Sequence, residues 1–215
     1  MPNSSRIVFV SLFLLYAAFW VWYGGSGDPL SEEEARVYLA RMQEIAAASA
    51  HSEPRLGQAF SQLSSQDDGN EFYMINLMKF REKAAYPPGY DYDDDVQAAA
   101  ARYSAAVIPR LIVRGSHPIL MAYPQGRFLD FPGADDWDQV AIVRYRSRRD
   151  MFEFAIDLGE DEQGVHKWAS LEKTHVFPAR PVVDFVFVRG FVAVLLATIG
   201  FGAHWIIKRR LVRSA

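Results

Sequence analysis

The feature that most constrains the fold is an uncharged apolar segment near each end of the chain. Residues 7–23 are 17 residues without a charged side chain, and residues 190–207 form a second run whose one ionisable group is His204. At about 1.5 Å per residue, a helix of the first run is about 25 Å long, close to the thickness of the hydrocarbon layer. We therefore predict two transmembrane segments, 1–23 and 182–215.

The first segment has two other interpretations, a cleaved signal peptide and a buried core helix. A signal peptide usually has an apolar core of about 7–15 residues followed by a small-residue cleavage site. Here the run is longer and ends in Trp20, Trp22 and Tyr23, aromatic residues that favour the membrane interface. The pattern favours an uncleaved anchor.

Basic residues indicate the orientation of the two spans. The second run is followed at once by four cationic residues, Lys208, Arg209, Arg210 and Arg213. Because such clusters stay in the cytoplasm, we expect both termini to be cytoplasmic and the middle of the chain to be extracytoplasmic, or periplasmic in a bacterium. The lipid bilayer is then the first predicted partner.

The central part of the chain is acidic. Residues 24–181 contain 17 Lys and Arg residues against 25 Asp and Glu residues, a formal charge of −8. Phosphate backbones repel such a surface, so we expect no nucleic-acid partner. The chain has no cysteine, which excludes disulfides, thiolate nucleophiles and cysteine metal sites.

The central region divides into two predicted parts. Residues 24–70 read as a linker followed by an extra helix, in which Ser31 and Glu34 form a capping box at the start and the helix continues to about Ala50. A second short helix is expected between residues 54 and 66. Residues 71–181 read as a folded α+β domain.

Within 71–181 the apolar periodicity predicts six elements. Strands are expected at 72–80, 117–128, 137–146 and 175–179. A helix is expected from the acidic residues 93–95 to between Pro109 and Gly115, and another after the cap Ser147, with a broken helical stretch through Lys173. The order strand, helix, strand, strand, helix, strand predicts a ferredoxin-like βαββαβ sheet with its helices on one face.

Several short stretches of this region carry a family resemblance: residues 74–81, 101–103, 143–148, 166–167, 171–172 and 174, with Gly115 before the second strand. They resemble the dimeric α+β barrel superfamily, and within it the uncharacterised family known as domain of unknown function 1330. The likeness covers residues 72–178. It departs from the family at Ser116, where a second glycine is usual, and at Arg146, where proline is common.

The resemblance implies a dimeric α/β barrel, in which the sheets of two copies pack face to face as a homodimer. It implies no activity, although relatives in the superfamily include monooxygenases, haem-handling enzymes and ligand-binding regulators. It also places a histidine at His166, which could be a general base, a haem ligand or a residue at a helix end.

The sequence predicts neither a metal site nor a cofactor. Residues 91–95 are rich in aspartate, but Val96 stands where a calcium loop needs glycine, so helix capping explains them better. The histidines are scattered without zinc-ligand spacing. No glycine-rich phosphate loop or G-x-S-x-G nucleophile motif is present.

One candidate ligand-binding cleft remains. Asn76 interrupts an apolar strand, and Arg144 shares the strand parity of Val140 and Ile142. Because the first and third strands are neighbours in the ferredoxin-like order, Asn76 and Arg144 are expected to meet, either at a ligand or in a structural hydrogen bond. Tyr145 and His166 are expected at the rim.

Two functions from different classes follow. The preferred one is a binding or interaction module for a small apolar or anionic ligand or a membrane partner. The alternative is a small-molecule enzyme of the monooxygenase or isomerase type. The sequence shows no recognisable nucleophile, metal cluster or cofactor loop, which favours the binding function.

Overall fold

The computed structural model describes residues 3–24, 27–48, 56–126, 128–129 and 136–213 of the 215-residue chain. The chain forms two compact units. One consists of residues 1–24 and 183–215, here the helical hairpin. The other, residues 25–182, is here the central unit.

The helical hairpin consists of α1 (Asn3–Gly24) and α7 (Val188–Arg213). Both helices are long and apolar enough to cross a membrane, and most of their side chains are exposed. They run antiparallel, because Phe9 near the start of α1 packs against Phe201 near the end of α7, while Tyr16 donates a hydrogen bond to the Arg189 carbonyl at 3.3 Å.

Polar contacts join the hairpin near each end. The His204 ring nitrogen Nδ1 lies 3.0 Å from Ser5 Oγ. At the other end the Arg189 guanidinium lies over the rings of Trp20 and Tyr23, 4.9 and 5.3 Å from their centroids. Side-chain contacts between α1 and α7 therefore link the two helices near both ends of the hairpin.

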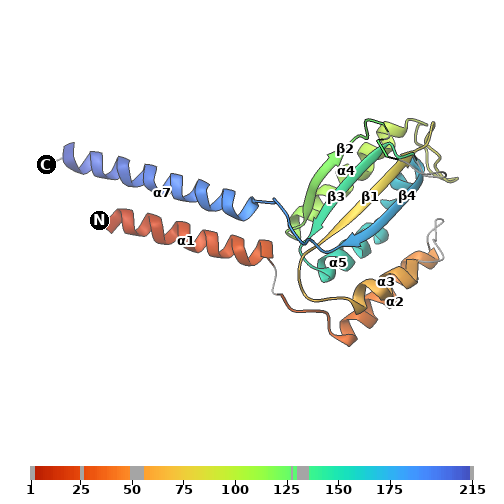
Figure 1. The fold of residues 1–215 in the computed structure, drawn as a ribbon, viewed down its shortest axis with the longest axis horizontal. Helices are drawn as coiled ribbons and strands as arrows, with labels where there is room; N and C mark the ends of the chain where they lie inside the picture. Colours follow the sequence, from red (N-terminus) through yellow and green to blue (C-terminus); the bar gives the residue numbers. More distant parts are fainter. Residues whose placement is uncertain (1–2, 25–26, 49–55, 127, 130–135, 214–215) are drawn as a thin grey trace. The chain divides into compact units, whose positions relative to one another are not determined.

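The central unit has the α+β composition that the sequence predicts. Its elements are α2 (Glu32–Ala48), α3 (Leu56–Ser65), β1 (Phe72–Phe80), α4 (Val96–Val113), β2 (His117–Ala122), β3 (Gln139–Tyr145), α5 (Arg148–Glu160), α6 (Gly164–Ser170) and β4 (Leu171–Ala179). The strands form one antiparallel sheet in the order β2-β3-β1-β4 (Figure 1). The prediction that the first and third strands are neighbours in the sheet is confirmed.

The predicted helix starts are confirmed by their caps. Ser31 and Glu34 exchange hydrogen bonds in a capping box, with the Ser31 amide 2.9 Å from the Glu34 carboxylate and the Glu34 amide 3.2 Å from Ser31 Oγ. Asp95 accepts from two amides at the start of α4. Ser147 accepts from the Asp150 amide at the start of α5.

Two predicted boundaries are wrong. Residues 171–173 were expected in a helical stretch but begin β4, where Leu171 pairs with Phe80 and Lys173 with Lys79. Pairing with a full-length β1 outweighs local helix preference there. The strand expected at 117–128 ends at Ala122. The predicted end of α4 between Pro109 and Gly115 is confirmed, because this helix ends at Val113.

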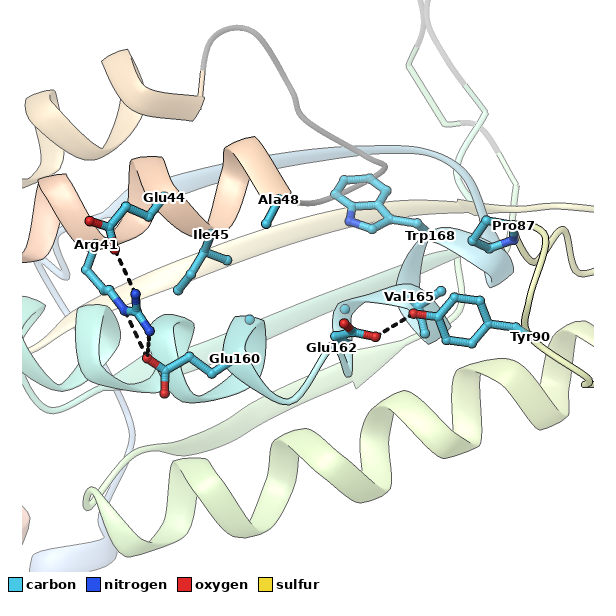
Figure 2. Close-up of a pocket in the computed structure, with 12 residues that line it drawn as sticks. Arg41, Glu44, Ile45, Ala48, Pro87, Tyr90, Glu160, Glu162, Val165 and Trp168 are labelled. Carbon is cyan, nitrogen blue, oxygen red and sulfur yellow. Dashed lines mark hydrogen bonds and ion pairs between the residues drawn. The ribbon is translucent and has the colours of Figure 1, made fainter.

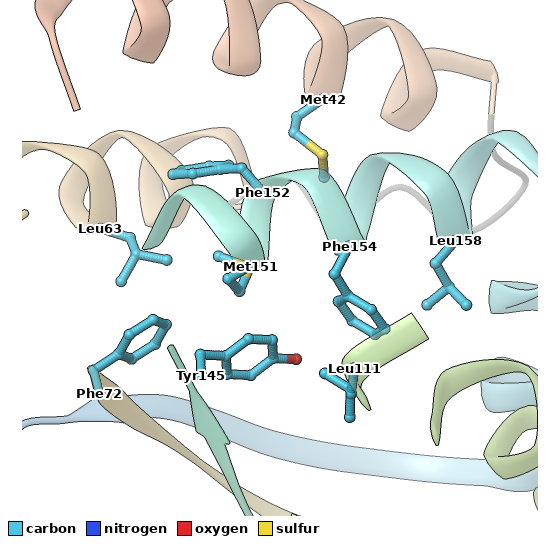
Figure 3. Close-up of a cluster of buried hydrophobic side chains, with 9 residues drawn as sticks. All are labelled: Met42, Leu63, Phe72, Leu111, Tyr145, Met151, Phe152, Phe154 and Leu158. Atoms are coloured by element: carbon cyan, nitrogen blue, oxygen red, sulfur yellow. The ribbon is translucent and has the colours of Figure 1, made fainter. Parts of the chain in front are cut away.

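The core lies between the sheet and the helices on one of its faces. Figure 3 shows α5 between the sheet and α2, with the side chains of both layers directed into the space between them. Phe152 of α5 stacks on Tyr38 of α2 with ring centroids 5.6 Å apart. The buried cluster is Met42, Leu63, Phe72, Leu111, Tyr145, Met151, Phe152, Phe154 and Leu158. The extra helix α2 therefore covers α5 and not the sheet.

The other face of the sheet is apolar and partly exposed. Ile75 of β1 lies opposite Ile142 of β3 and Phe177 of β4, and Leu120 of β2 lies opposite Ile142. None of the described helices of the central unit packs on this face (Figure 1). We call the face formed by Ile75, Leu120, Ile142 and Phe177 the open sheet face.

Candidate functional site

The predicted meeting of Asn76 and Arg144 is wrong. In β1 and β3, Asn76 lies opposite Ala141, whereas Arg144 lies opposite Tyr73. Residues directly opposite each other share a face and successive residues alternate, so Asn76 faces α4 and Arg144 faces the other way. Neither a shared ligand nor a hydrogen bond between these two side chains is possible in this register.

Arg144 is instead part of a structural ion pair. Its side chain is 1% exposed, its Nε donates to Glu71 Oε2 at 2.8 Å, and an Nη donates to the Gly115 carbonyl at 2.7 Å. It therefore joins β3 to the residue before β1 and to the turn between α4 and β2.

Asn76 and Tyr145, in contrast, face the same cavity. This α4 cavity has a volume of about 130 Å³ and lies between the sheet and α4, with α6 at one side. Most of its lining is apolar and includes Met78, Val107, Leu111, Met121, Val143 and Phe154. The polar residues that also line it are Asn76, Tyr103, Ser104, Gln139, Tyr145, Lys167 and Ser170.

Asn76 is held by its amide nitrogen. Nδ2 donates to the carbonyls of Met74 at 3.1 Å and Ala141 at 3.4 Å. No described residue donates to its Oδ1. The oxygen is therefore free to accept a hydrogen bond at the cavity wall.

The two tyrosines of the cavity are protonated at physiological pH. Burial raises the pKa of Tyr103 to about 12. Burial, together with the nearby Tyr103, raises the pKa of Tyr145 above its ordinary value. Tyr145 is fixed by stacking on Phe72 at 5.4 Å and by a tilted contact with Phe154 at 5.9 Å, and Figure 3 shows its hydroxyl directed toward Leu111. Both hydroxyl groups are hydrogen-bond donors.

Lys167 of α6 is the residue that sequence reasoning missed. Burial lowers the pKa of its amine to about 8. Its Nζ lies 5.2 Å from the centroid of the Trp168 ring, and no carboxylate among the described residues pairs with it. The signal in the sequence was the His166-Lys167 pair within the family resemblance, which indicated a role for the histidine and none for the lysine.

His166 lies in a separate cluster rather than at the cavity. It is buried, its Nδ1 lies 2.9 Å from Tyr86 Oη, and its ring meets Tyr92 edge-on at 5.0 Å. Arg102 lies over the Tyr92 ring at 4.7 Å. Burial and, to a smaller extent, Arg102 lower the pKa of His166. The predicted rim position of His166 beside Asn76 is therefore wrong.

A larger groove of about 630 Å³ lies along α2, α5, α6 and the loop at Pro87 (Figure 2). Its charged groups are already paired: Arg41 meets Glu160 at 2.6 Å and Glu44 at 2.7 Å, and Tyr90 donates to Glu162 at 2.8 Å. Because these groups satisfy one another, the α4 cavity is the better candidate site.

Two solved structures are similar to this chain. The protein of unknown function RPA0582 from Rhodopseudomonas palustris has 24% sequence identity and a TM-score of 0.54, and the match covers 63% of this chain and all of that one. A structure of methylated RPA0582 has 25% identity and the same TM-score, over 62% of this chain and 96% of that one. No family model and no curated protein matches the chain. The likeness thus supports the α+β fold. Because the similar protein is of unknown function, the function of this chain is inferred from the geometry of its site.

Proposed function

We propose that this chain is a membrane-anchored, extracytoplasmic protein whose central unit binds a small molecule in the α4 cavity. The observation that carries the proposal is the cavity itself. It combines apolar walls with polar side chains, and neither Asn76 Oδ1 nor the Lys167 amine has a hydrogen-bond or ion-pair partner among the described residues. Concave apolar sites with a few converging polar groups are the usual form of small-molecule sites.

The topology supports a ferredoxin-like domain of the dimeric α+β barrel type, near the family named domain of unknown function 1330. The sheet order β2-β3-β1-β4 with α4 and α5 on one face is the arrangement expected of the split βαβ fold. The open sheet face is the surface that a second copy of the chain covers in a face-to-face homodimer.

The helical hairpin supports the membrane location. Its antiparallel contacts put Arg6 at the same end as Lys208–Arg213, so one cytoplasmic side accommodates all of these cations. The central unit then lies on the opposite side of the bilayer.

An enzymatic function is the alternative, and one observation favours it. The Lys167 amine, with its pKa lowered to about 8, can accept and return a proton near neutral pH, as a proton-transferring isomerase requires. A catalytic turnover that is lost in Lys167→Met would select this alternative over simple binding.

The binding proposal is tested on the full chain in phosphatidylcholine nanodiscs, with methionine methyl groups labelled with ¹³C. Benzamide, a neutral molecule of matching size, is the probe. We expect it to shift the resonances of Met78 and Met121, which line the cavity, and to leave Met42, which lies between α2 and α5, in place.

Two phenylalanine substitutions on α4 give the control. Ala100 lines the cavity, whereas Ala105 is exposed on the same helix. Ala100→Phe fills the site and should abolish the shifts, and Ala105→Phe should preserve them. Absence of any shift at millimolar benzamide, or identical behaviour of the two variants, would refute the binding site.

A further inference from the structure

Lys167 is a partly buried cation that has no counter-ion among the described residues. No residue in the described part of the chain forms an ion pair or a hydrogen bond with its amine, and burial is the cause that lowers its pKa. The buried Arg144, by comparison, has Glu71. An ammonium group that is partly removed from water and has no acceptor is unfavourable, and such groups cluster at functional sites.

The neighbouring polar groups match a carboxylate. Tyr103 and Tyr145 have protonated hydroxyls that can donate, and the Lys167 amine donates and supplies positive charge. These groups come from three elements, α4, β3 and α6, that converge on the same space. A carboxylate accepts several such bonds, and charge-assisted ones are the strongest.

The rest of the cavity determines the size and character of the ligand. A cavity of about 150 Å³ accommodates one benzene-sized molecule, and the α4 cavity measures about 130 Å³. Its walls, such as Met78, Val107 and Leu111, offer no second cation. A phosphate dianion or a dicarboxylate would therefore leave charge unpaired in an apolar site.

We propose that the α4 cavity binds an organic monocarboxylate with a single ring or a chain of about six carbons, its carboxylate paired with Lys167. The proposal rests on the proposed binding function and specifies its ligand class. Tyr103 and Tyr145 donate to the same carboxylate, and the apolar body of the ligand lies against the sheet beneath α4.

The test compares benzoate with benzamide, its neutral isostere, on the full chain in the same nanodiscs. Dissociation constants are taken from the Met78 and Met121 shifts. We expect benzoate to bind at least about tenfold more tightly than benzamide, since a buried charge pair contributes at least that factor. Lys167→Met should remove this preference while benzamide binding persists. Lys173→Met, which changes an exposed lysine on β4, should retain it.

A pH series provides a second measurement that needs no variant. The ionisable groups that line the cavity are Lys167, Tyr103 and Tyr145, and beside Lys167 on α6 the ring of His166 lies against Tyr86. Benzoate affinity should fall between pH 7 and pH 10 as Lys167 loses its proton, whereas benzamide affinity should not change.

The outcomes separate the two proposals. Benzamide binding with no preference for benzoate overturns the monocarboxylate assignment and leaves the binding site standing. A benzoate preference that survives Lys167→Met also overturns it. If neither molecule shifts Met78 or Met121, both proposals fail.

Discussion

Arg144 shows how a buried cation is stabilised in this protein. Its guanidinium has a carboxylate partner, Glu71, and a backbone acceptor, Gly115. Arg144→Met leaves both without their donor, so we expect a loss of about 3 kcal/mol in the free energy of unfolding. Asn76→Leu removes two weaker bonds to backbone carbonyls and should lower it by about 1 kcal/mol. Thermal or denaturant unfolding of the two variants measures this difference, and equal stabilities would contradict the structural role of Arg144.

For Lys167 we expect the opposite effect on the free energy of unfolding, an increase when the cation is removed. Its folded pKa is about 8 and its unfolded value is near the ordinary 10.5, so between these values the unfolded chain binds more protons and stability rises with pH. Lys167→Met removes a destabilising charge and should raise the free energy of unfolding at pH 7 by on the order of 2 kcal/mol. The gain should decline through pH 8–10.5. A variant less stable than the natural chain at pH 7 would show that the lysine is structural.

At the level of single residues, the sequence predicts local interactions better than contacts across the sheet. The caps at Ser31, Asp95 and Ser147 depend on neighbours within three residues, and all three form. The Asn76–Arg144 contact depends on the register between β1 and β3. Side-chain parity is readable within each strand, but the sequence does not reveal which residues lie opposite each other, and a shift of one residue exchanges the faces.

Substitutions at Gly200 and Gly202, two of the three glycines of α7, distinguish helix pairing from simple membrane insertion. A Cβ at Gly200 would lie 2.8 Å from the Phe9 ring of α1, whereas a Cβ at Gly202 would meet nothing within 4 Å. Gly200→Leu should therefore weaken the α1–α7 contact, and Gly202→Leu should not.

The readout is an engineered disulfide in a chain that has no cysteine of its own. Ser5→Cys with His204→Cys replaces a side-chain contact of 3.0 Å across the hairpin, and oxidation should cross-link it. Adding Gly200→Leu should reduce the yield several-fold relative to Gly202→Leu. Equal yields would show that the helices do not pack through this glycine.

At the level of elements, amphipathic and apolar periodicity predicted the helices and strands but not all of their packing. The position of α2 on α5 depends on a close approach at Gly159, where a Cβ would lie 2.5 Å from Ile45. The sequence shows a glycine there but not its neighbour. The early start of β4 likewise depends on a partner strand far away in the chain, and local propensity does not report such pairing.

At the scale of the whole molecule, the open sheet face leads to a prediction about assembly. Phe177 and Val176 are adjacent in β4 and similarly exposed, 37% and 40%, but alternate faces. Phe177→Lys introduces a charge on the open sheet face and should convert the proposed homodimer to a monomer. Val176→Lys should leave it dimeric. Mass measurement of the full chain in detergent distinguishes the states, and a monomeric natural chain would contradict the barrel assembly.

In the proposed topology the hairpin spans the membrane and the central unit lies outside the cytoplasm. The cysteine-free chain allows a direct measurement with one cysteine at a time. Phe128 of the central unit is 97% exposed, and Val212 at the basic end of α7 is 72% exposed.

Phe128→Cys and Val212→Cys are compared in intact spheroplasts with a membrane-impermeant maleimide. We expect Phe128→Cys to be labelled at once and Val212→Cys only after the membrane is permeabilised, because the basic cluster stays in the cytoplasm. Labelling of Val212→Cys in intact cells while Phe128→Cys is protected would contradict the account.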